Sequence, residues 1–272
     1  MMSYAEKFDG HDALDNCGTG GSGLPRFNIS TTAAFVLTSG GVKIAKHGNR
    51  GIGGRVGSFD ILEKLGVPFD FGPEKAQEIL EKHGIVFLFA PKYHPAMKNV
   101  GSIRLELKIK TIFNILGPLL SPAQVENQII GVSSLEDGEK IVEVLKILGR
   151  KKFLIVHGAD KLDEITISDK TYIFEYFGEE IKKYEINPEE LGVNKVSFNK
   201  IKGGDLDENA EKTEAILKGE KSAKSEMVAL NAGAGFYLMR ESKSINDGVD
   251  KAREILLSGE AWKKMEDIKK AK

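Results

Sequence analysis

The chain has 272 residues, with 39 Lys or Arg against 40 Asp or Glu, so its formal net charge is −1. This balance excludes the strongly basic surface of a dedicated nucleic-acid binder and leaves only a local basic patch as an option. The single cysteine, Cys17, excludes an internal disulfide and favours a reducing cytoplasm, and no apolar run is long enough to span a membrane. Glycine is enriched, with 30 residues and no collagen-like period, so we expect the excess in specific loops.

Short apolar runs alternate with amphipathic stretches in the first part of the chain. We expect strands at 41–45, 85–89, 128–132 and 153–156, and helices at 31–39, 58–65, 74–83 and 138–148. Continuous apolar strands are typical of parallel sheets that are buried on both faces, and alternation of strand and helix indicates an α/β domain. The sequence therefore predicts an α/β fold with a mainly parallel central sheet flanked by helices.

Two segments interrupt this alternation. Residues 92–114 form a helical stretch without a clear strand, which we expect to be a reduced helical subdomain beside the sheet. Residues 172–186 alternate like an antiparallel hairpin that turns at 178–180. The rest is expected to be helical, at 209–217, 224–239 and 247–257, with a charged, solvated helix end at 263–272. The α/β domain would then comprise residues 1–91 and 115–272.

The first candidate site is the glycine loop Gly18-Thr19-Gly20-Gly21-Ser22-Gly23, which leads through Phe27-Asn28-Ile29-Ser30-Thr31 into an apolar helix. Exposed N–H groups and the helix dipole at such a helix start favour an anion. Asn28, Ser30 and Thr31 are residue types that cap helices and can also hydrogen-bond to phosphate oxygens. From the glycines alone, a tight turn with an ordinary cap is an equally good interpretation.

A second glycine loop favours the phosphate interpretation. It follows the predicted strand at 41–45, carries Lys46, Arg50 and Arg55 among its glycines, and leads into a helix at Ser58. In open α/β sheets, ligands bind at the carboxyl ends of the strands. Two such loops facing one crevice would suit a ligand with more than one phosphate.

A pair of neighbouring carboxylates, Asp163 and Glu164, follows the strand that ends near His157-Gly158. Carboxylates in a loop at a strand end can hold Mg²⁺, which prefers oxygen ligands and usually keeps waters and substrate phosphates. A surface acidic pair taken alone usually has no such role. Beside a pyrophosphate site, however, this pair is a candidate metal site.

A longer series of motifs then identifies a family. In chain order these are Gly18-Thr19-Gly20-Gly21, Phe27-Asn28-Ile29-Ser30-Thr31, Lys46-His47-Gly48-Asn49-Arg50, Phe89-Ala90-Pro91-Lys92-Tyr93-His94, Arg104, Thr111-Ile112-Phe113-Asn114-Ile115-Leu116-Gly117-Pro118-Leu119 and Asp163-Glu164. Together they closely resemble the anthranilate phosphoribosyltransferases, from about Asp15 to the C-terminal helices. The resemblance implies the class IV phosphoribosyltransferase fold, which pyrimidine nucleoside phosphorylases share. It also implies a glycosyltransferase of tryptophan biosynthesis that moves the phosphoribosyl group of 5-phosphoribosyl 1-pyrophosphate (PRPP) to anthranilate and releases pyrophosphate.

The resemblance also implies roles for individual residues. PRPP would be bound by Gly18, Gly20, Gly21, Asn28, Ser30, Thr31, Lys46 and Ser58. Anthranilate would lie near His47, Asn49, His94, Arg104 and Pro118, with Arg104 meeting its carboxylate. Mg²⁺ would be held by Ser30, Asp163 and Glu164. Because the aromatic amine is already nucleophilic, no side chain is assigned as a nucleophile or base.

Several positions depart from the family pattern. Ser22 stands where the family normally has an aspartate, and residues 51–57 are rich in glycine where the family has serines and a lysine, although Arg55 keeps the positive charge. Lys108 and Lys110 replace a glycine and an arginine. A typical member also begins with further helices, which build much of a helical domain and the dimer interface. Residues 92–114 would be the remnant of that domain, and the homodimer of the family is in doubt for this chain.

Three alternatives to an active transferase stay open. One is an enzyme similar to pyrimidine nucleoside phosphorylases, which the glycine-rich 51–57 loop favours but the 46–50 motif and Arg104 oppose. Another is a relative that binds nucleic acid through the same basic loops, against which the neutral overall charge speaks. The last is a shortened, impaired or non-catalytic relative that binds PRPP without turnover.

Overall fold

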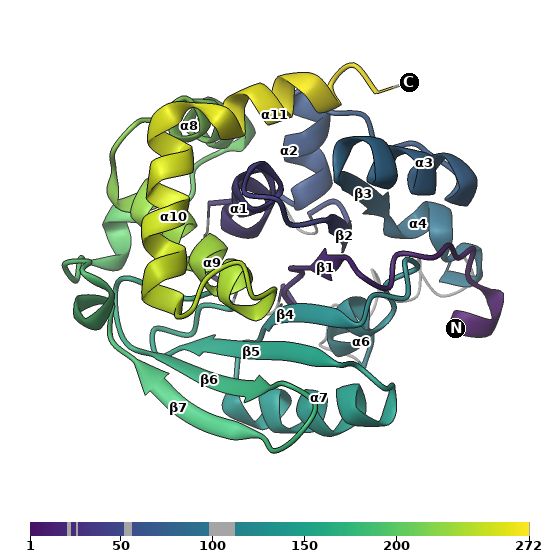
Figure 1. The fold of residues 1–272 in the computed structure, drawn as a ribbon, viewed down its shortest axis with the longest axis horizontal. Coiled ribbons are helices and arrows are strands. Elements are labelled where there is room, and N and C mark those ends of the chain that lie inside the picture. Colours follow the sequence, from purple (N-terminus) through teal and green to yellow (C-terminus); the bar gives the residue numbers. More distant parts are fainter. Residues whose placement is uncertain (21–22, 26, 52–55, 98–111, 272) are drawn as a thin grey trace.

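The computed structural model describes residues 1–20, 23–25, 27–51, 56–97 and 112–271. These residues form a seven-stranded sheet with the strand order β3-β2-β1-β4-β5-β6-β7 (Figure 1). The strands are β1 (Leu14–Asp15), β2 (Ile44–Gly48), β3 (Ile85–Phe89), β4 (Asn127–Gly131), β5 (Lys152–Gly158), β6 (Thr171–Tyr176) and β7 (Lys182–Ile186). The five strands from β3 to β5 in that order pair in parallel, whereas β6 and β7 pair antiparallel to their neighbours.

Helices cover the sheet in two layers. One layer gathers around α1 (Ile29–Ser39), which contacts α8 (Leu206–Leu217), α9 (Ala223–Leu238), α10 (Ile245–Ser258) and α11 (Glu260–Ile268) (Figure 1). In addition, α2 (Ser58–Lys64) contacts α8, and α3 (Pro73–His83) and α4 (Ala90–Tyr93) contact β3. The other layer contains α6 (Phe113–Leu119) and α7 (Leu135–Ile147), and α7 packs on β5 and β6. Short 3-10 helices lie at Met2–Tyr4, Pro95–Met97, Pro188–Leu191 and Phe198–Lys200.

Strand β5 is apolar over residues 153–156 because both of its faces are buried. Leu154 and Val156 belong to the large core cluster on the α1 side of the sheet. Phe153 and Ile155 belong to a second cluster, which contains Leu145 of α7. Successive strand residues point to opposite faces, so a strand covered on both sides needs apolar residues throughout. The predicted α/β class with a mainly parallel sheet is confirmed.

Most predicted elements are confirmed, with shifted ends. Strand β3 covers the predicted 85–89, and the expected hairpin is formed by β6 and β7. Strand β2 starts later than predicted because residues 40–42 still close the end of α1. Gly41 has a φ of +98°, and the Val42 N–H donates to the Leu37 carbonyl. Strand β1 was not predicted, since two residues show no periodicity.

The C-terminal end and the 92–114 stretch differ from the elements expected there. The charged C-terminal end is not merely a solvated face: α11 contacts α1 and buries Ala261, Met265 and Ile268. Of the expected helical stretch at 92–114, residues 98–111 lie outside the described residues, and its flanks contain the end of α4, a 3-10 turn and the start of α6. The division into an α/β domain and a helical remnant therefore stays a prediction.

The sheet topology places a crevice beside β1. From β1 the chain proceeds outward to β2 and β3, and it then returns to the other side of β1 as β4. Such a reversal opens a crevice at the carboxyl ends of the two strands that flank it, here β1 and β4. In the part of the chain that the structure describes, no helix has the length and apolarity needed to cross a membrane.

Candidate functional site

The first glycine loop, the end of β4 and the acidic loop after β5 meet at this crevice. The Thr19 N–H donates to the Gly131 carbonyl over 2.8 Å, and the Gly20 N–H donates to Oδ2 of Asp163 over 2.9 Å. A Cβ on Gly131 would lie 1.7 Å from the Asp163 carbonyl oxygen, and one on Gly18 would lie 3.0 Å from Oδ2 of Asp163. Glycine at 131 is therefore required for the acidic loop to approach β4.

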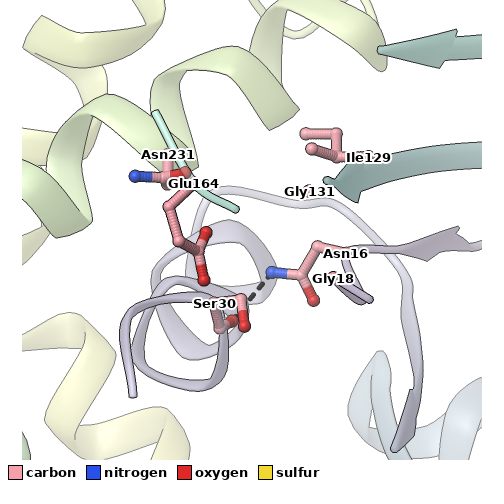
Figure 2. A pocket seen from close by; sticks show the side chains of 7 residues that line it. All are labelled: Asn16, Gly18, Ser30, Ile129, Gly131, Glu164 and Asn231. Atoms are coloured by element: carbon pink, nitrogen blue, oxygen red, sulfur yellow. Dashed lines mark hydrogen bonds between the residues drawn. The ribbon is translucent and has the colours of Figure 1, made fainter. Parts of the chain in front are cut away.

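A small cavity lies between these loops (Figure 2). It is lined by Asn16, Gly18, Ser30, Ile129, Gly131, Glu164 and Asn231. Three residues predicted for PRPP or metal binding, Gly18, Ser30 and Glu164, thus come together from three separate elements. In Figure 2 the Glu164 carboxylate is directed toward Ser30.

The second glycine loop is joined to the first through Asn28. The Asn28 Nδ2 donates to the Val56 carbonyl over 3.3 Å, so the start of α1, which follows the first loop, contacts the end of the second loop. Asn28 is the N-cap residue of α1, but its side chain makes no capping hydrogen bond. Its Oδ1 is buried and has no partner among the described residues. Ser30 and Thr31 lie in the first turn of the same helix, and Thr31 is buried.

Side chains of the first turn of α2 hold the two described ends of the second loop together. Oδ2 of Asp60 accepts hydrogen bonds of 2.8 Å from the N–H groups of both Gly51 and Gly57. The Ser58 hydroxyl donates to the carbonyl of Asn49 over 3.3 Å. Ser58 and Asn49, predicted for different substrates, are therefore in contact.

Two cations of this loop that the structure describes, Arg50 and Lys46, are each held by neighbouring groups. The Arg50 guanidinium donates to Glu63 on α2 over 2.8 Å, so it is held against that helix. Lys46 is buried, and its Nζ donates to the Asn16 carbonyl over 2.8 Å and to Oδ1 of Asn16 over 3.2 Å. The Asn16 Nδ2 in turn donates to the Ser30 carbonyl over 2.8 Å. Lys46 is thus linked to the crevice through Asn16.

Asp15, at the end of β1, is a fully buried carboxylate beside Lys46. Its Oδ1 accepts the His47 N–H over 3.2 Å, and its Oδ2 has no partner within the described part of the chain. Burial raises the pKa of Asp15 to about 7, although the Lys46 charge opposes that shift. Because desolvation outweighs attraction, the carboxyl takes up a proton close to neutral pH.

His47 and His94 form a buried pair beside β2. His47 follows Lys46 in the strand, so the two side chains point to opposite faces of the sheet. The Nδ1 of His47 lies 3.1 Å from the Gly117 carbonyl, and the Nε2 of His94 lies 2.9 Å from the Leu120 carbonyl. A carbonyl only accepts, so these two nitrogens carry the hydrogens. The remaining nitrogens, Nε2 of His47 and Nδ1 of His94, are buried acceptors with no partner among the described residues. Burial lowers the pKa of both rings, that of His47 to about 3.

Pro118 is held beside this pair by a chain of polar contacts. Its carbonyl accepts from Nε2 of the buried Gln128 over 2.7 Å, and Oε1 of Gln128 accepts from Nε of Arg150 over 2.9 Å. Pro118 follows Gly117, the partner of His47. Three residues predicted for anthranilate, His47, His94 and Pro118, therefore lie together, while Asn49 is exposed in the second loop.

Some predicted positions lie outside the described residues: Gly21 of the PRPP set, Arg104 of the anthranilate set, and the departures Ser22, Arg55, Lys108 and Lys110. Conversely, the structure adds residues that the sequence did not indicate: Asp15, Asn16, Gln128 and Asn231. The sequence feature that could have indicated them is that each is a polar residue within or beside an apolar run. Only the pairing of distant elements shows what these side chains hold.

The chemistry of the acidic corner fits a hard cation. Ser30 and Glu164 line one cavity, and Asp163 is held to the first glycine loop by the Gly20 N–H. One hydroxyl and two carboxylates are the oxygen ligands that Mg²⁺ prefers, and they leave positions for water and phosphate oxygens. Within the described ranges there is no group of three or more His, Cys, Asp or Glu that could hold a metal by themselves.

Comparison with known proteins identifies the family. The family model described as "Glycosyl transferase family, a/b domain" matches residues 10–262. An anthranilate phosphoribosyltransferase from Clostridium beijerinckii is 49% identical over 255 residues, which cover 94% of this chain and 75% of the relative. This chain belongs to the anthranilate phosphoribosyltransferase family. A second relative of the same name, from Persephonella marina, is 43% identical over 94% of this chain and 76% of its own length.

Solved structures of this family have the same fold. The anthranilate phosphoribosyltransferase of Thermus thermophilus gives a TM-score of 0.92 at 42% identity, over 99% of this chain and 81% of that one. The Saccharomyces cerevisiae enzyme in complex with PRPP and Mg gives 0.89 at 29% identity, over 98% and 76%. The same yeast enzyme in complex with 4-fluoroanthranilate gives 0.87 at 28%, over 99% and 76%. Membership of this family of pentosyl-transferring enzymes disfavours the phosphorylase and nucleic-acid alternatives.

Proposed function

We propose that this chain transfers the phosphoribosyl group of PRPP to anthranilate, giving N-(5-phosphoribosyl)anthranilate and pyrophosphate, as a step of tryptophan biosynthesis. The amine nitrogen forms a bond to C1 of the ribose and gives up one proton to solvent, while the bond from C1 to the pyrophosphate oxygen breaks and pyrophosphate leaves with the bonding electrons. The observation that carries the proposal is the placement of Lys46 and His47. These consecutive residues of β2 have partners on opposite sides of the strand, Asn16 in the PRPP crevice and Gly117 beside the second histidine.

The proposed PRPP site consists of the crevice and its two loops. Backbone N–H groups of the first loop and of the start of α1 provide donors for phosphate oxygens. Lys46 contributes a positive charge near the crevice, because its Nζ contacts Asn16 and Asn16 lines the cavity. The buried Oδ1 of Asn28, which has no partner in the part of the chain that the structure describes, is an acceptor for a hydroxyl of the ribose. Gly21, Thr31 and Ser58 complete the proposed set.

Mg²⁺ is proposed to bind at Ser30, Asp163 and Glu164. When bound with PRPP, the ion neutralises negative charge on the leaving pyrophosphate. The chain itself holds Asp163 through the Gly20 N–H, so one carboxylate is oriented before a substrate arrives. Fixed donors that face a developing negative charge lower the barrier because they need no rearrangement during the reaction. The yeast relative in complex with PRPP and Mg supports this assignment.

Anthranilate is proposed to bind beside His47 and His94, with Asn49, Arg104 and Pro118 around it. The two bare imidazole nitrogens accept hydrogen bonds, which suits the N–H groups of an aromatic amine. Arg104 would pair with the carboxylate. The neutral histidines add no competing positive charge. The yeast relative in complex with 4-fluoroanthranilate supports a site for this substrate class.

We also propose a cytoplasmic location, on the single cysteine and the biosynthetic relatives. No nucleic-acid partner is proposed, since the net charge is −1.

The test of the proposed function is a fluorescence assay. We expect anthranilate fluorescence to fall only when the purified chain, Mg²⁺ and PRPP are all present. The variants Asp163→Asn and Arg104→Ala should abolish the fall, whereas Glu180→Gln, in the turn between β6 and β7, should not. Constant fluorescence together with PRPP binding would indicate a non-catalytic relative instead.

A further inference from the structure

Asn231 connects helix α9 to the loop that carries the acidic pair. Its Oδ1 accepts the Ile165 N–H over 3.0 Å, and its Nδ2 donates to the carbonyls of Ile165 and Met227, both over 2.8 Å. An asparagine amide has two N–H donors and one carbonyl acceptor, and here each kind is used. Because the side chain is also buried, its orientation is fixed.

The position of Ile165 makes this contact important for the metal site. Its N–H belongs to the peptide bond that follows Glu164, and its carbonyl belongs to the next peptide bond. Asn231 therefore fixes the backbone directly after the acidic pair from both sides. In Figure 2, Asn231 lies beside Glu164, and both residues line the crevice.

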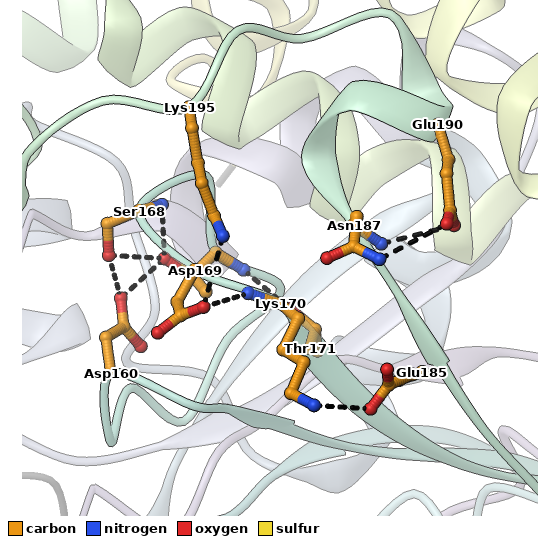
Figure 3. Close-up of polar contacts among 10 residues, drawn as sticks. Asp160, Ser168, Asp169, Lys170, Thr171, Glu185, Asn187, Glu190 and Lys195 are labelled. Atoms are coloured by element: carbon orange, nitrogen blue, oxygen red, sulfur yellow. Dashed lines mark hydrogen bonds and ion pairs between the residues drawn. The ribbon is translucent and has the colours of Figure 1, made fainter.

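The Asp160 side chain holds the acidic loop together from within. Oδ1 of Asp160 accepts the Leu162 N–H over 3.1 Å, and its Oδ2 accepts from the Thr166 hydroxyl over 2.6 Å. Oδ2 of Asp160 also accepts from the Ser168 hydroxyl (Figure 3). Asp160 thus ties the segment before the acidic pair to the segment after it. These bonds shape the loop but do not attach it to a helix, which Asn231 does.

We propose that Asn231 is a positioning residue that sets the affinity of the Asp163–Glu164 pair for a divalent cation. It acts by holding the acidic loop to α9, so that the two carboxylates need not be ordered when the ion binds. Residues that orient metal ligands typically change metal affinity by about 10- to 100-fold when they are replaced. The proposal rests on the proposed metal site but not on the identity of the accepting substrate.

The chain offers a matched control in Asn209 on α8. This asparagine is also buried, and it holds a different loop in the same way: its Oδ1 accepts the Gly204 N–H over 2.9 Å, and its Nδ2 donates to the Gly204 carbonyl over 3.4 Å. The variant Asn209→Ala therefore removes an equivalent contact away from the acidic pair. Any loss that it shares with Asn231→Ala is a loss of stability only.

The experiment measures Mn²⁺ binding by electron paramagnetic resonance in the presence of pyrophosphate. We expect Asn231→Ala to weaken Mn²⁺ binding at least about tenfold and Asn209→Ala to leave it within about twofold of the wild type. Hydrogen exchange of the 162–168 segment should rise only in Asn231→Ala. Activity of this variant should recover at high metal concentration, with kcat close to that of the wild type.

Unchanged Mn²⁺ affinity in Asn231→Ala, or an equal loss in Asn209→Ala, would overturn the proposal. If Asn231→Ala does not fold, Asn231→Leu serves in its place: it has a similar volume, adds no charge, loses the acceptor and both donors, and is expected to weaken Mn²⁺ binding as well. Failure of the proposed function has a different signature. In that case anthranilate is not consumed by the wild type, while the difference in Mn²⁺ affinity between the variants persists.

Discussion

The rings of His47 and His94 pack edge to face, with centroids 5.3 Å apart and an interplanar angle of 65°. Each donates one ring N–H to a backbone carbonyl, of Gly117 and Leu120 respectively. Both carbonyls lie at the C-terminal end of α6, so this short helix fixes the protonated nitrogen in each ring. The other two ring nitrogens, Nε2 of His47 and Nδ1 of His94, are therefore hydrogen-bond acceptors, and neither has a partner among the described residues.

The first prediction concerns the acceptor nitrogen of His47. In His47→Asn, the amide NH₂ can replace Nδ1 as the donor to Gly117, whereas the acceptor Nε2 is lost. We expect KM for anthranilate to rise about fivefold, because one hydrogen bond contributes about 1 kcal/mol. KM for PRPP should stay unchanged. Steady-state kinetics check this, with His11→Asn at an exposed histidine as the control. An unaltered KM for anthranilate would show that Nε2 does not receive the amine.

The second prediction is a pH dependence of stability caused by Asp15. Burial raises the pKa of this carboxyl from 3.8 to about 7, so between these values the folded chain holds a proton that the unfolded chain has lost. Its contribution to stability is therefore present at low pH and is lost as pH rises toward 7. In Asp15→Asn this loss should be absent.

Urea unfolding at about pH 4 and about pH 7.5 measures the effect, since each pKa unit represents about 1.4 kcal/mol. We expect the change in unfolding free energy between the two pH values to differ between wild type and Asp15→Asn by at least about 1 kcal/mol. Asp70→Asn, at an exposed carboxylate, should behave like the wild type. The same pH slope in all three proteins would contradict the assignment.

The third prediction concerns the close approach at Gly131. In Gly131→Ala the new methyl group would meet the Asp163 carbonyl at 1.7 Å, so the acidic loop must move or β4 must shift. We expect a loss of about 2 kcal/mol or more in unfolding free energy, together with loss of PRPP-dependent Mg²⁺ binding. Chemical denaturation and calorimetric titration check the two effects.

Gly72→Ala is the matched control for that substitution. Gly72 precedes α3 with an ordinary backbone conformation, and no atom lies within 4 Å of its added Cβ. Its unfolding free energy should stay within about 0.5 kcal/mol of the wild type. If Gly131→Ala were as mild as this control, the proposed contact between β4 and the acidic loop would be wrong.

The fourth prediction concerns metal removal. The proposed donor set leaves several positions to water and substrate, so Mg²⁺ should bind weakly without PRPP. Addition of EDTA should therefore abolish PRPP binding, measured by calorimetry, while the melting temperature of the chain without substrate stays unchanged. A clear drop in that melting temperature would instead reveal a tightly held structural ion.

The sequence indicated much of the fold because strands and helices depend on local patterns. Apolar runs such as 85–89 predict buried parallel strands, and glycine loops before helices predict anion sites. Strand β1 escaped prediction because Leu14–Asp15 is too short for any pattern. It nevertheless lies between β2 and β4, where it creates the crevice.

The sequence by itself determined the fold class, the family resemblance and the positions of the loops, since hydrophobic periodicity and glycine content act over a few residues. Only the tertiary structure decided which side chains meet. The Gly20–Asp163 bond joins residues 143 positions apart, and burial of Asp15 and His47 depends on strands and helices drawn from distant segments. Protonation and ligand orientation follow from desolvation and hydrogen-bond partners, which exist only after these segments have packed together.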